Sequence, residues 1–274
     1  MKSLKTNLKI VFAAALGIVA MSSCSELTLS ENEIHVNGLD TVVSLQIDSK
    51  VPWTAEISDS TWIEISQSAG SGNALMLISA KINQDLSKNR ESSITIKTAK
   101  NFYVINIFQS PIKFNENGDL GLSVKWCEKN WQATSSIDDG KRVTGVKNIS
   151  ESHFRQPTKK EFQELFDNCK IYHVKKDTKN AVLFLAKNGN GIIFPLPDNG
   201  YSRYGNDYIY GQYFYNYSRE TQVVKIEYNP YDGVQTYFSN FWQGSYLGMY
   251  PEVELLRMVS DYSLDDSNET VENK

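Results

Sequence analysis

Residues 41–65 read TVVSLQIDSKVPWTAEISDSTWIEI and contain three short runs in which apolar and polar side chains alternate. Because successive side chains of a strand point to opposite faces, this period of two is typical of strands with one buried face. Similar runs, separated by Gly, Asn, Asp and Ser, continue to Gln109 without a helical pattern. Residues 24–111 are therefore expected to form an all-β sandwich, which ends at Pro111 because proline cannot continue a hydrogen-bonded ladder.

The order of particular residues in this region resembles that of a known family. Val51-Pro52-Trp53 is followed by Trp62-Ile63, by Ser68-Ala69-Gly70-Ser71-Gly72, by Asn83 and Arg90, and by a last strand that ends Phe108-Gln109. This order is similar to that of the BACON domain, an immunoglobulin-like sandwich of Bacteroidetes surface and secreted proteins. The family name implies carbohydrate binding, but the residues themselves point to architecture. We expect the two tryptophans to pack between sheets, Asn83 and Arg90 to order a connection, Gln109 to cap backbone groups, and the domain to act as a spacer.

Two triplets in this region resemble the acceptor for protein O-glycosylation in the same bacterial group, in which a Ser or Thr follows Asp. They are Asp40-Thr41-Val42 and Asp59-Ser60-Thr61. Thr41 and Ser60 are therefore candidate acceptors, although such short triplets also arise by chance.

The N-terminus has the pattern of a secretory signal. Three lysines precede an apolar run from Ile10 to Met21, and small residues lead to Cys24. The run is shorter than the roughly 20 residues that cross a bilayer. Its end resembles a bacterial lipobox, which implies cleavage after residue 23, lipidation of Cys24 and anchoring at the outer membrane or cell surface. The alternative is an ordinary secreted protein whose signal contains a cysteine.

Charge excludes one class of partner. Removal of residues 1–23 takes away three lysines and no acid, so the formal net charge falls from −4 to −7. Recognition of nucleic acid needs a basic face, and we expect none here. The last stretch, 261–274, is acidic and lacks apolar periodicity, which predicts a disordered tail.

The composition changes after Pro111. Residues 112–117 read as a short polar linker, and a helix is expected from Thr158. Thr158 and Glu161 have the spacing of a capping box, and a face of apolar residues follows at Phe162, Leu165, Phe166 and Cys169. Asn188-Gly189-Asn190 separates two apolar runs and predicts a hairpin. Further strands are expected at 223–228, 234–241 and 255–259, which together favour an α+β domain.

Landmarks of a second family follow one another through residues 118–260. They are Leu122 to Cys127 with Asn130, then Arg155-Gln156-Pro157-Thr158, Asn188-Gly189-Asn190, Gly200-Tyr201, Gly211-Gln212-Tyr213 and the closing Leu256-Arg257-Met258-Val259. This succession resembles the Fibrobacter succinogenes major paralogous domain, a module of bacterial surface proteins. The resemblance implies a C-type-lectin-like fold, shared with formylglycine-generating enzymes. The chain is thus expected to be multi-domain, an all-β immunoglobulin-like sandwich followed by an α+β C-type-lectin-like domain.

The second domain holds two cysteines, Cys127 and Cys169. An even pair in an extracytoplasmic protein favours a disulfide, with two buried free thiols as the next interpretation and a reactive or metal-binding pair as the last.

Motifs that carry chemistry are missing from the sequence. No H-E-x-x-H, G-x-S-x-G, phosphate-cradling loop or C-x-x-C occurs. His153 and His173 match no usual zinc spacing, and Gln156-Pro157-Thr158 lacks the acidic ligand that C-type lectins use for calcium. We therefore expect neither catalysis nor a metal or other cofactor.

Residues 201–217 read YSRYGNDYIYGQYFYNY and hold seven of the chain's 15 tyrosines. Tyr201, Tyr213 and Tyr215 fall on framework positions of the second family, so we expect them to be packed. The candidate ligand-binding residues come from the loop between Tyr201 and Tyr213 and from a later aromatic pair. They are Arg203, Tyr204, Asn206, Asp207, Tyr208, Tyr210, Trp242 and Tyr246. They suggest a non-catalytic surface module that binds glycan or mucin-type ligands without calcium. The alternative is an adhesin or protein-interaction module of a surface assembly.

Overall fold

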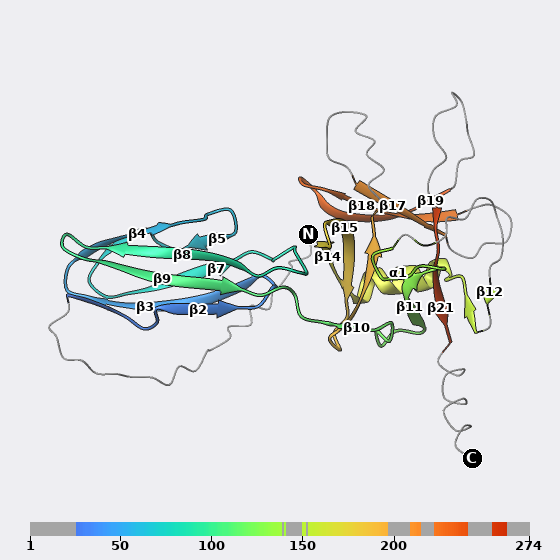
Figure 1. Cartoon of the computed structure of the whole chain (residues 1–274), viewed down its shortest axis with the longest axis horizontal. Helices are drawn as coiled ribbons and strands as arrows, with labels where there is room; N and C mark the ends of the chain where they lie inside the picture. Colours follow the sequence, from blue (N-terminus) through green and yellow to red (C-terminus); the bar gives the residue numbers. More distant parts are fainter. Residues whose placement is uncertain are drawn as a thin grey trace, which may run out of the picture. The chain divides into compact units, whose positions relative to one another are not determined.

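The computed structural model describes residues 26–138, 140, 150–151, 153–196, 209–214, 222–240 and 254–261 (Figure 1). The chain divides into two compact units, Met1–Lys113 and Phe114–Lys274, and each is described here by itself. The described residues form mainly β-strands and a single helix. None of their helices is both long enough and apolar enough to cross a membrane. The expected signal segment 1–23, the lipidation candidate Cys24 and residues 262–274 of the expected tail lie outside the described residues.

The first unit consists of two sheets that share one core. The strands are β1 (Leu27–Leu29), β2 (Glu33–Val36), β3 (Thr41–Ser49), β4 (Pro52–Ile57), β5 (Ile63–Ile65), β6 (Ala69–Ser71), β7 (Ala74–Ala80), β8 (Arg90–Lys97) and β9 (Phe102–Gln109). One sheet has the order β1-β3-β7-β5 and the other β2-β9-β8-β4-β6. Alternate residues of the longer strands enter the core between the sheets, among them Leu45, Ile47, Met76 and Ile78 from one sheet and Ile94, Ile96, Ile105 and Ile107 from the other. The expected all-β architecture of this region is confirmed.

The two tryptophans of this unit are packed inside, as expected. Trp53 and Trp62 are 2% and 3% exposed. The Trp53 indole Nε1 donates a hydrogen bond to the Gly72 carbonyl at 3.1 Å, and a Cβ on Gly70 would lie only 2.5 Å from the Trp53 ring. Gly70 is therefore required because any side chain there would occupy the space of the indole.

Three polar residues order the long connection between β7 and β8. The Asn83 side chain, 3% exposed, donates to the carbonyls of Lys88 and Ser110. The Arg90 guanidinium donates to Gln109 Oε1 at 2.7 Å and stacks over Trp62, while the Gln109 amide donates to two backbone carbonyls. These contacts confirm the framework roles expected for Asn83, Arg90 and Gln109.

The chain enters and leaves the first unit at opposite ends. At the start, Glu26 is tied to the β8–β9 loop because its carboxylate accepts hydrogen bonds from Thr98 and Asn101. At the end, the Ser110 carbonyl lies at Asn83, beside the far end of β9. Strand β9 runs from the β8–β9 loop beside Glu26 to Ser110 beside Asn83. Its eight residues span about 26 Å at the usual rise per residue.

The second unit contains the helix α1 (Lys159–Asn168) and short sheets around it. Its strands are β10 (Asn115–Glu116), β11 (Lys125–Asn130), β12 (Ser150–Glu151), β13 (Phe154–Arg155), β14 (Lys170–Lys176), β15 (Lys179–Leu185), β16 (Asn190–Pro195), β17 (Ile209–Phe214), β18 (Gln222–Asn229), β19 (Gly233–Asn240), β20 (Glu254–Leu255) and β21 (Arg257–Ser260). The sheet orders are β10-β16-β15-β14, β11-β21-β13-β12 and β19-β18-β17-β20. The strands expected at 223–228, 234–241 and 255–259 correspond to β18, β19 and the pair β20 and β21.

Part of the expected linker 112–117 has regular structure. Asn115 and Glu116 form β10, which pairs in parallel with Asn190 and Gly191 of β16. The side chain of Glu116 also accepts a hydrogen bond from Lys176 Nζ at 2.9 Å. Polarity alone suggested a linker, but these residues satisfy their backbone groups at a sheet edge.

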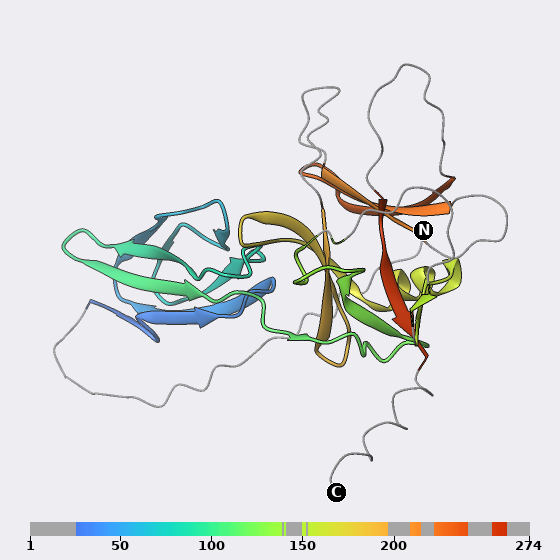
Figure 2. The same ribbon diagram turned by 45° about the vertical axis from the view of Figure 1, so that its right-hand side comes forward.

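The helix forms as the sequence predicts. The Thr158 hydroxyl and the Glu161 carboxylate make both hydrogen bonds of the capping box, and Phe162 and Leu165 are fully buried. Together with Trp126 and Val259 they belong to one core, so α1 packs beside β11 and β21 (Figures 1 and 2). The expected hairpin joins β15 and β16, with Gly189 at φ +86°.

Glu161 is predicted to make the stability of the second unit depend on pH. Burial raises the pKa of Glu161, but hydrogen bonds from Arg155 and from the Thr158 backbone outweigh it, and the net pKa is lowered. A carboxylate with a lowered folded-state pKa stabilises the fold above its unfolded pKa and loses that contribution as the pH falls through the folded value. Glu161→Gln keeps a capping side chain but loses the ion pair, and should cost roughly 1–2 kcal/mol at neutral pH.

The measurement is thermal unfolding of both chains from pH 7 downward. We expect the difference between Glu161→Gln and the unchanged chain to shrink as the pH drops below the ordinary glutamate range. A difference that stays constant down to pH 2 would show that the carboxylate charge contributes nothing.

Candidate functional site

Arg257 is the most deeply buried charge among the described residues, with 0% of its surface exposed. Its guanidinium donates to Asn130 Oδ1 at 2.8 Å, to the Cys127 carbonyl at 2.8 Å and to the Ile193 carbonyl at 2.6 Å. It also stacks 4.5 Å from the centre of the Phe194 ring. Burial lowers the pKa of Arg257 to about 10, so the side chain keeps its charge at neutral pH. Arg257 therefore joins β21 to β11 and β16.

The sheet that Arg257 fixes has two different faces. Trp126 of β11 pairs with Val259 of β21, and both side chains lie in the core with Phe162 of α1. Because strand side chains alternate, the neighbours of this pair point to the opposite face. On that face a pocket of about 600 Å³ opens, and its lining includes Lys125, Cys127, Phe154, Met258 and Ser260.

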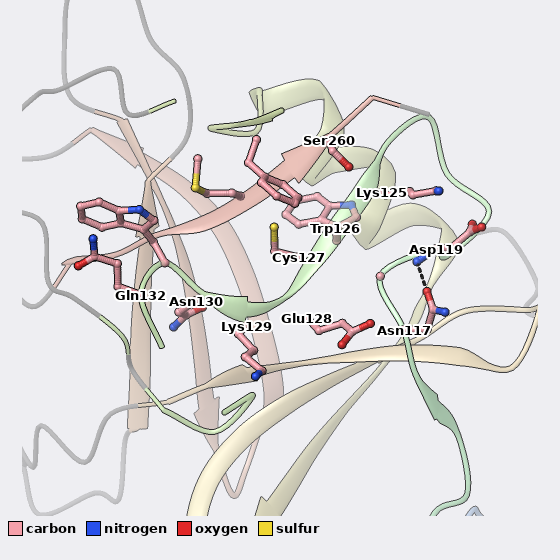
Figure 3. Close-up of a pocket in the computed structure, with 14 residues that line it drawn as sticks. Asn117, Asp119, Lys125, Trp126, Cys127, Glu128, Lys129, Asn130, Gln132 and Ser260 are labelled. Carbon is pink, nitrogen blue, oxygen red and sulfur yellow. Dashed lines mark hydrogen bonds between the residues drawn. The ribbon is translucent and has the colours of Figure 1, made fainter. Parts of the chain in front are cut away.

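The walls of the pocket come from two loops. The loop Asn117–Asp119 lies beside β11, where the Asn117 side chain accepts a hydrogen bond from the Asp119 amide at 2.8 Å (Figure 3). A Cβ on Gly118 would lie 1.5 Å from the Trp126 carbonyl oxygen, so only glycine allows this close approach. Trp131 and Gln132 form the other wall, and the Trp131 amide donates to the Leu256 carbonyl at 2.7 Å.

The lining combines apolar and aromatic side chains with a polar rim. Phe154 is 42% exposed and Trp131 is half-buried, whereas Met258 lines the floor of the pocket but is only 4% exposed. Lys125, Glu128 and Lys129 contribute charges of both signs, and the exposed Gln132 contributes a neutral donor and acceptor, while Ser260 is buried at the floor. Aromatic surface bordered by polar groups suits a ligand with one apolar and one hydrogen-bonding face, such as a sugar ring.

The expected disulfide between Cys127 and Cys169 is wrong. Both are free thiols. Cys169 ends α1 and packs against the core, whereas Cys127 lies on the pocket face of β11. Because Trp126 next to Cys127 occupies the core face of the strand, the two sulfurs lie on opposite sides of the sheet. Burial raises the pKa of each thiol to about 11.

His173 also has a structural environment. Its ring stacks on Tyr228 with centroids 3.5 Å apart, and its Nε2 is 3.0 Å from Asn180 Oδ1. Burial lowers the pKa of His173, which keeps the ring neutral at physiological pH. Among the described residues, no three His, Cys, Asp or Glu side chains cluster in a way that would hold a metal ion.

Most of the expected tyrosine-loop site lies outside the described residues. This holds for Arg203, Tyr204, Asn206, Asp207, Tyr208, Trp242 and Tyr246. Tyr210 is in β17, where its backbone pairs with Glu227. Tyr213, expected to be framework, is fully buried and donates a 2.7 Å hydrogen bond to the Pro195 carbonyl. Tyr201 and Tyr215 are also outside the described part.

The pocket was not expected from the sequence. Lys125, Cys127 and Met258 belong to landmarks of the second family, Cys127 is otherwise a disulfide candidate, and Phe154 belongs to no motif. One signal was present: Trp126 and Val259 are apolar, while Lys125 and Ser260 beside them are polar, so the strands have one face outside the core.

The two O-glycosylation candidates differ in exposure. Ser60 is exposed in a turn, where the Asp59 side chain accepts hydrogen bonds from Thr61 and from Trp62 Nε1. Thr41 is the first residue of β3 and is half-buried, and its hydroxyl donates a hydrogen bond to the Leu39 carbonyl at 2.8 Å. Ser60 is thus the more accessible hydroxyl.

No family model matches the chain, and no curated protein matches it. Among solved structures it is similar to a Bacteroides ovatus GH5 xyloglucanase in complex with a XXXG heptasaccharide, with 21% identity and a TM-score of 0.29, over 34% of this chain and 22% of that one. It is also similar to WR4, a C. elegans MSP family member, with 11% identity and a TM-score of 0.25, over 32% of this chain and 98% of that one. A third similar structure is the periplasmic chaperone SfaE, with 8% identity and a TM-score of 0.26, over 78% of this chain and 98% of that one. TM-scores this low assign neither fold family nor function.

Arg257→Lys should destabilise the second unit while retaining the positive charge. Lysine cannot reach Asn130, Cys127 and Ile193 together because it lacks the planar fork of donors. We expect a loss of about 3 kcal/mol, since buried polar groups are left without partners. Hydrogen exchange of peptides from β11 and β16 measures this loss, and peptides of the first unit are the internal reference.

Arg155→Lys is the matched control. Arg155 is partly exposed and pairs with Glu161 and Asp261, so the same substitution should have a much smaller effect on β11 and β16. Equal protection losses in the two variants would contradict the central position of Arg257.

The two thiols should react slowly in the folded chain. A thiol with a pKa of about 11 is ionised about a hundred times less at pH 8 than an ordinary cysteine. Titration with a thiol reagent at pH 8 should therefore be roughly a hundredfold slower before than after denaturation. Failure to titrate Cys127 and Cys169 in denaturant would reveal a disulfide and overturn the assignment.

Proposed function

We propose that this chain is a non-catalytic cell-surface lipoprotein, anchored through Cys24, whose second unit binds glycan or mucin-type ligands without calcium. The first unit is a spacer of the BACON type with an immunoglobulin-like sandwich. The second unit is of the Fibrobacter succinogenes major paralogous type, with an α+β C-type-lectin-like fold.

The pocket on the outer face of β11, β21 and β13 carries the proposal for ligand class. Its size of about 600 Å³ suits one or two sugar rings. Phe154 offers an exposed aromatic surface to the apolar face of a sugar, and rim residues such as Lys125 and Gln132 can exchange hydrogen bonds with its hydroxyls. No metal ligand is needed for either contact.

The geometry of the first unit supports the spacer. The chain enters beside Glu26 and leaves at Ser110, at the two ends of a strand about 26 Å long. A sandwich joined in this way holds the segment on its N-terminal side apart from the segment on its C-terminal side.

The thiols support a non-catalytic function. An oxidative enzyme related to the formylglycine-generating type would need reactive cysteines, whose thiolates are the nucleophiles. Cys127 and Cys169 have raised pKa values and lie on opposite sides of a sheet, so they suit neither redox pairing nor attack on a substrate.

Protein–protein interaction is the second candidate, favoured by the β18–β19 hairpin. Tyr231 at its turn is 85% exposed and Tyr237 is 40% exposed. Exposed tyrosines of this kind are enriched at interfaces. This surface would suit an adhesin or a component of a surface assembly.

Binding of the mature chain to immobilised mucin-type glycans tests the first proposal. Phe154→Ala should weaken glycan binding about tenfold, as expected for the loss of one aromatic anchor. Tyr231→Ala is the matched control, an exposed aromatic residue on a different element, and should leave glycan binding unchanged. Tyr208→Ala with Trp242→Ala examines the tyrosine-loop site in the same assay.

The variants separate the alternatives. Glycan binding that persists in Phe154→Ala but disappears in the Tyr208 and Trp242 variant would move the site to the tyrosine loop. A protein partner that crosslinks to the unchanged chain and is lost in Tyr231→Ala, without any glycan signal, would support the interaction module instead.

A further inference from the structure

The end of the first unit at which the chain enters is held close to the proposed lipid anchor. Glu26 is fixed there because its carboxylate accepts hydrogen bonds from Thr98 and Asn101, and its carbonyl accepts one from the Lys50 amide at 3.0 Å. Only Ser25 separates Glu26 from Cys24. Two residue steps of extended chain span at most about 7 Å, so this end must lie near any membrane that holds Cys24.

We propose that this end of the sandwich, formed by the β3–β4 turn at 49–52 and the β8–β9 loop with Phe102, rests in the interface of the bilayer. The contact rests on the anchor of the proposed function and adds an orientation to it. The partner is the headgroup region of a lipid bilayer, which receives apolar side chains from the protein.

Exposed apolar side chains gather at this end. Phe102 is 72% exposed, the largest exposure of a phenylalanine among the described residues, and Val104 on the same face of β9 is 41% exposed. The intervening Tyr103 points to the other face and packs against the core. Aromatic side chains favour the membrane interface, where one part meets hydrocarbon and the rest meets water. The exposed ring of Phe102 can therefore insert into the bilayer interface once Cys24 is anchored.

The charges around Phe102 also suit a lipid surface. Two acids of this region are engaged within the protein: Glu26 binds Thr98 and Asn101, and Glu56 pairs with Lys97 at 2.5 Å. Asp48 accepts a hydrogen bond from Gln46. Lys50 and Lys100 are exposed, and the pKa of Glu26 is lowered by hydrogen bonds from Thr98 and Asn101 and by the nearby charge of Lys100. Hydrogen bonds from neutral donors leave Glu26 and Asp48 negatively charged, and Lys50 and Lys100 balance them, so this end suits a zwitterionic lipid surface along which the lysine stems can extend.

A hollow of about 450 Å³ opens at the same end. Its lining includes Glu26, Pro52, Trp53, Lys97 and Lys100. It lies between the β3–β4 turn and the β8–β9 loop, the two elements that the proposal places at the lipid surface. Its lining is more apolar than polar, with Val51 and Ala99 beside the two lysines, so it can receive the boundary between a lipid headgroup and its acyl chains.

The test uses the full mature, lipidated chain in phosphatidylcholine vesicles. Ala99→Cys, in the β8–β9 loop, carries an environment-sensitive fluorophore, and Lys88→Cys carries the same fluorophore as the matched control. Lys88 is exposed, and its carbonyl lies at Asn83 beside Ser110, at the opposite end of the sandwich. The unchanged chain, labelled in the same way, gives the background from Cys127 and Cys169.

We expect the label at position 99 to shift its emission to the blue and to be quenched by nitroxide attached to lipid headgroups. The label at position 88 should emit as it does in water. Phe102→Ser added to Ala99→Cys should abolish the blue shift without unfolding the unit, because Phe102 lies largely outside the core.

Two other results would overturn the proposal, and they are distinguishable. If mass spectrometry finds lipid on Cys24 but the label at position 99 emits like the one at 88, the contact is wrong and the anchor stands. If Cys24 carries no lipid, the anchor of the proposed function fails and the contact fails with it.

Discussion

The second unit depends on one buried cation. Arg257 has no carboxylate within ion-pair distance among the described residues, and it is compensated by two carbonyls, one side-chain amide and the face of Phe194. Burying an ion in this way is costly unless its donors are used. The guanidinium therefore fixes where β21 lies relative to β11 and β16. Because Met258 and Ser260 follow Arg257 on the same strand, its position also sets the floor of the pocket.

Each unit has a glycine where two parts of the chain approach one another closely. Gly70 leaves room for the Trp53 ring in the first unit, and Gly118 lies against the Trp126 carbonyl in the second. The two positions have different consequences for function. Gly70 maintains the core of a spacer, whereas Gly118 brings the Asn117–Asp119 loop against β11 and so forms one wall of the proposed binding site.

Local patterns predicted local structure well. The alternating runs of the first unit, the Thr158–Glu161 cap and the turn at Gly189 all carry their information within a few residues, and the structure contains each of them. Long-range relations were harder. The pairing of Cys127 with Cys169 failed because the side of a sheet on which each sulfur lies depends on how strands pair. The pocket was missed because Phe154, Lys125 and Met258 come from strands far apart in sequence.

Glycan binding by the second unit is proposed to take place on the outer face of β11, β21 and β13. A crystal structure of the mature chain with a bound mucin-type oligosaccharide tests it most directly. We expect a sugar ring stacked on Phe154, with its hydroxyls within hydrogen-bond distance of the rim that includes Lys125 and Gln132. An oligosaccharide bound elsewhere on the chain, with this pocket unoccupied, would contradict it.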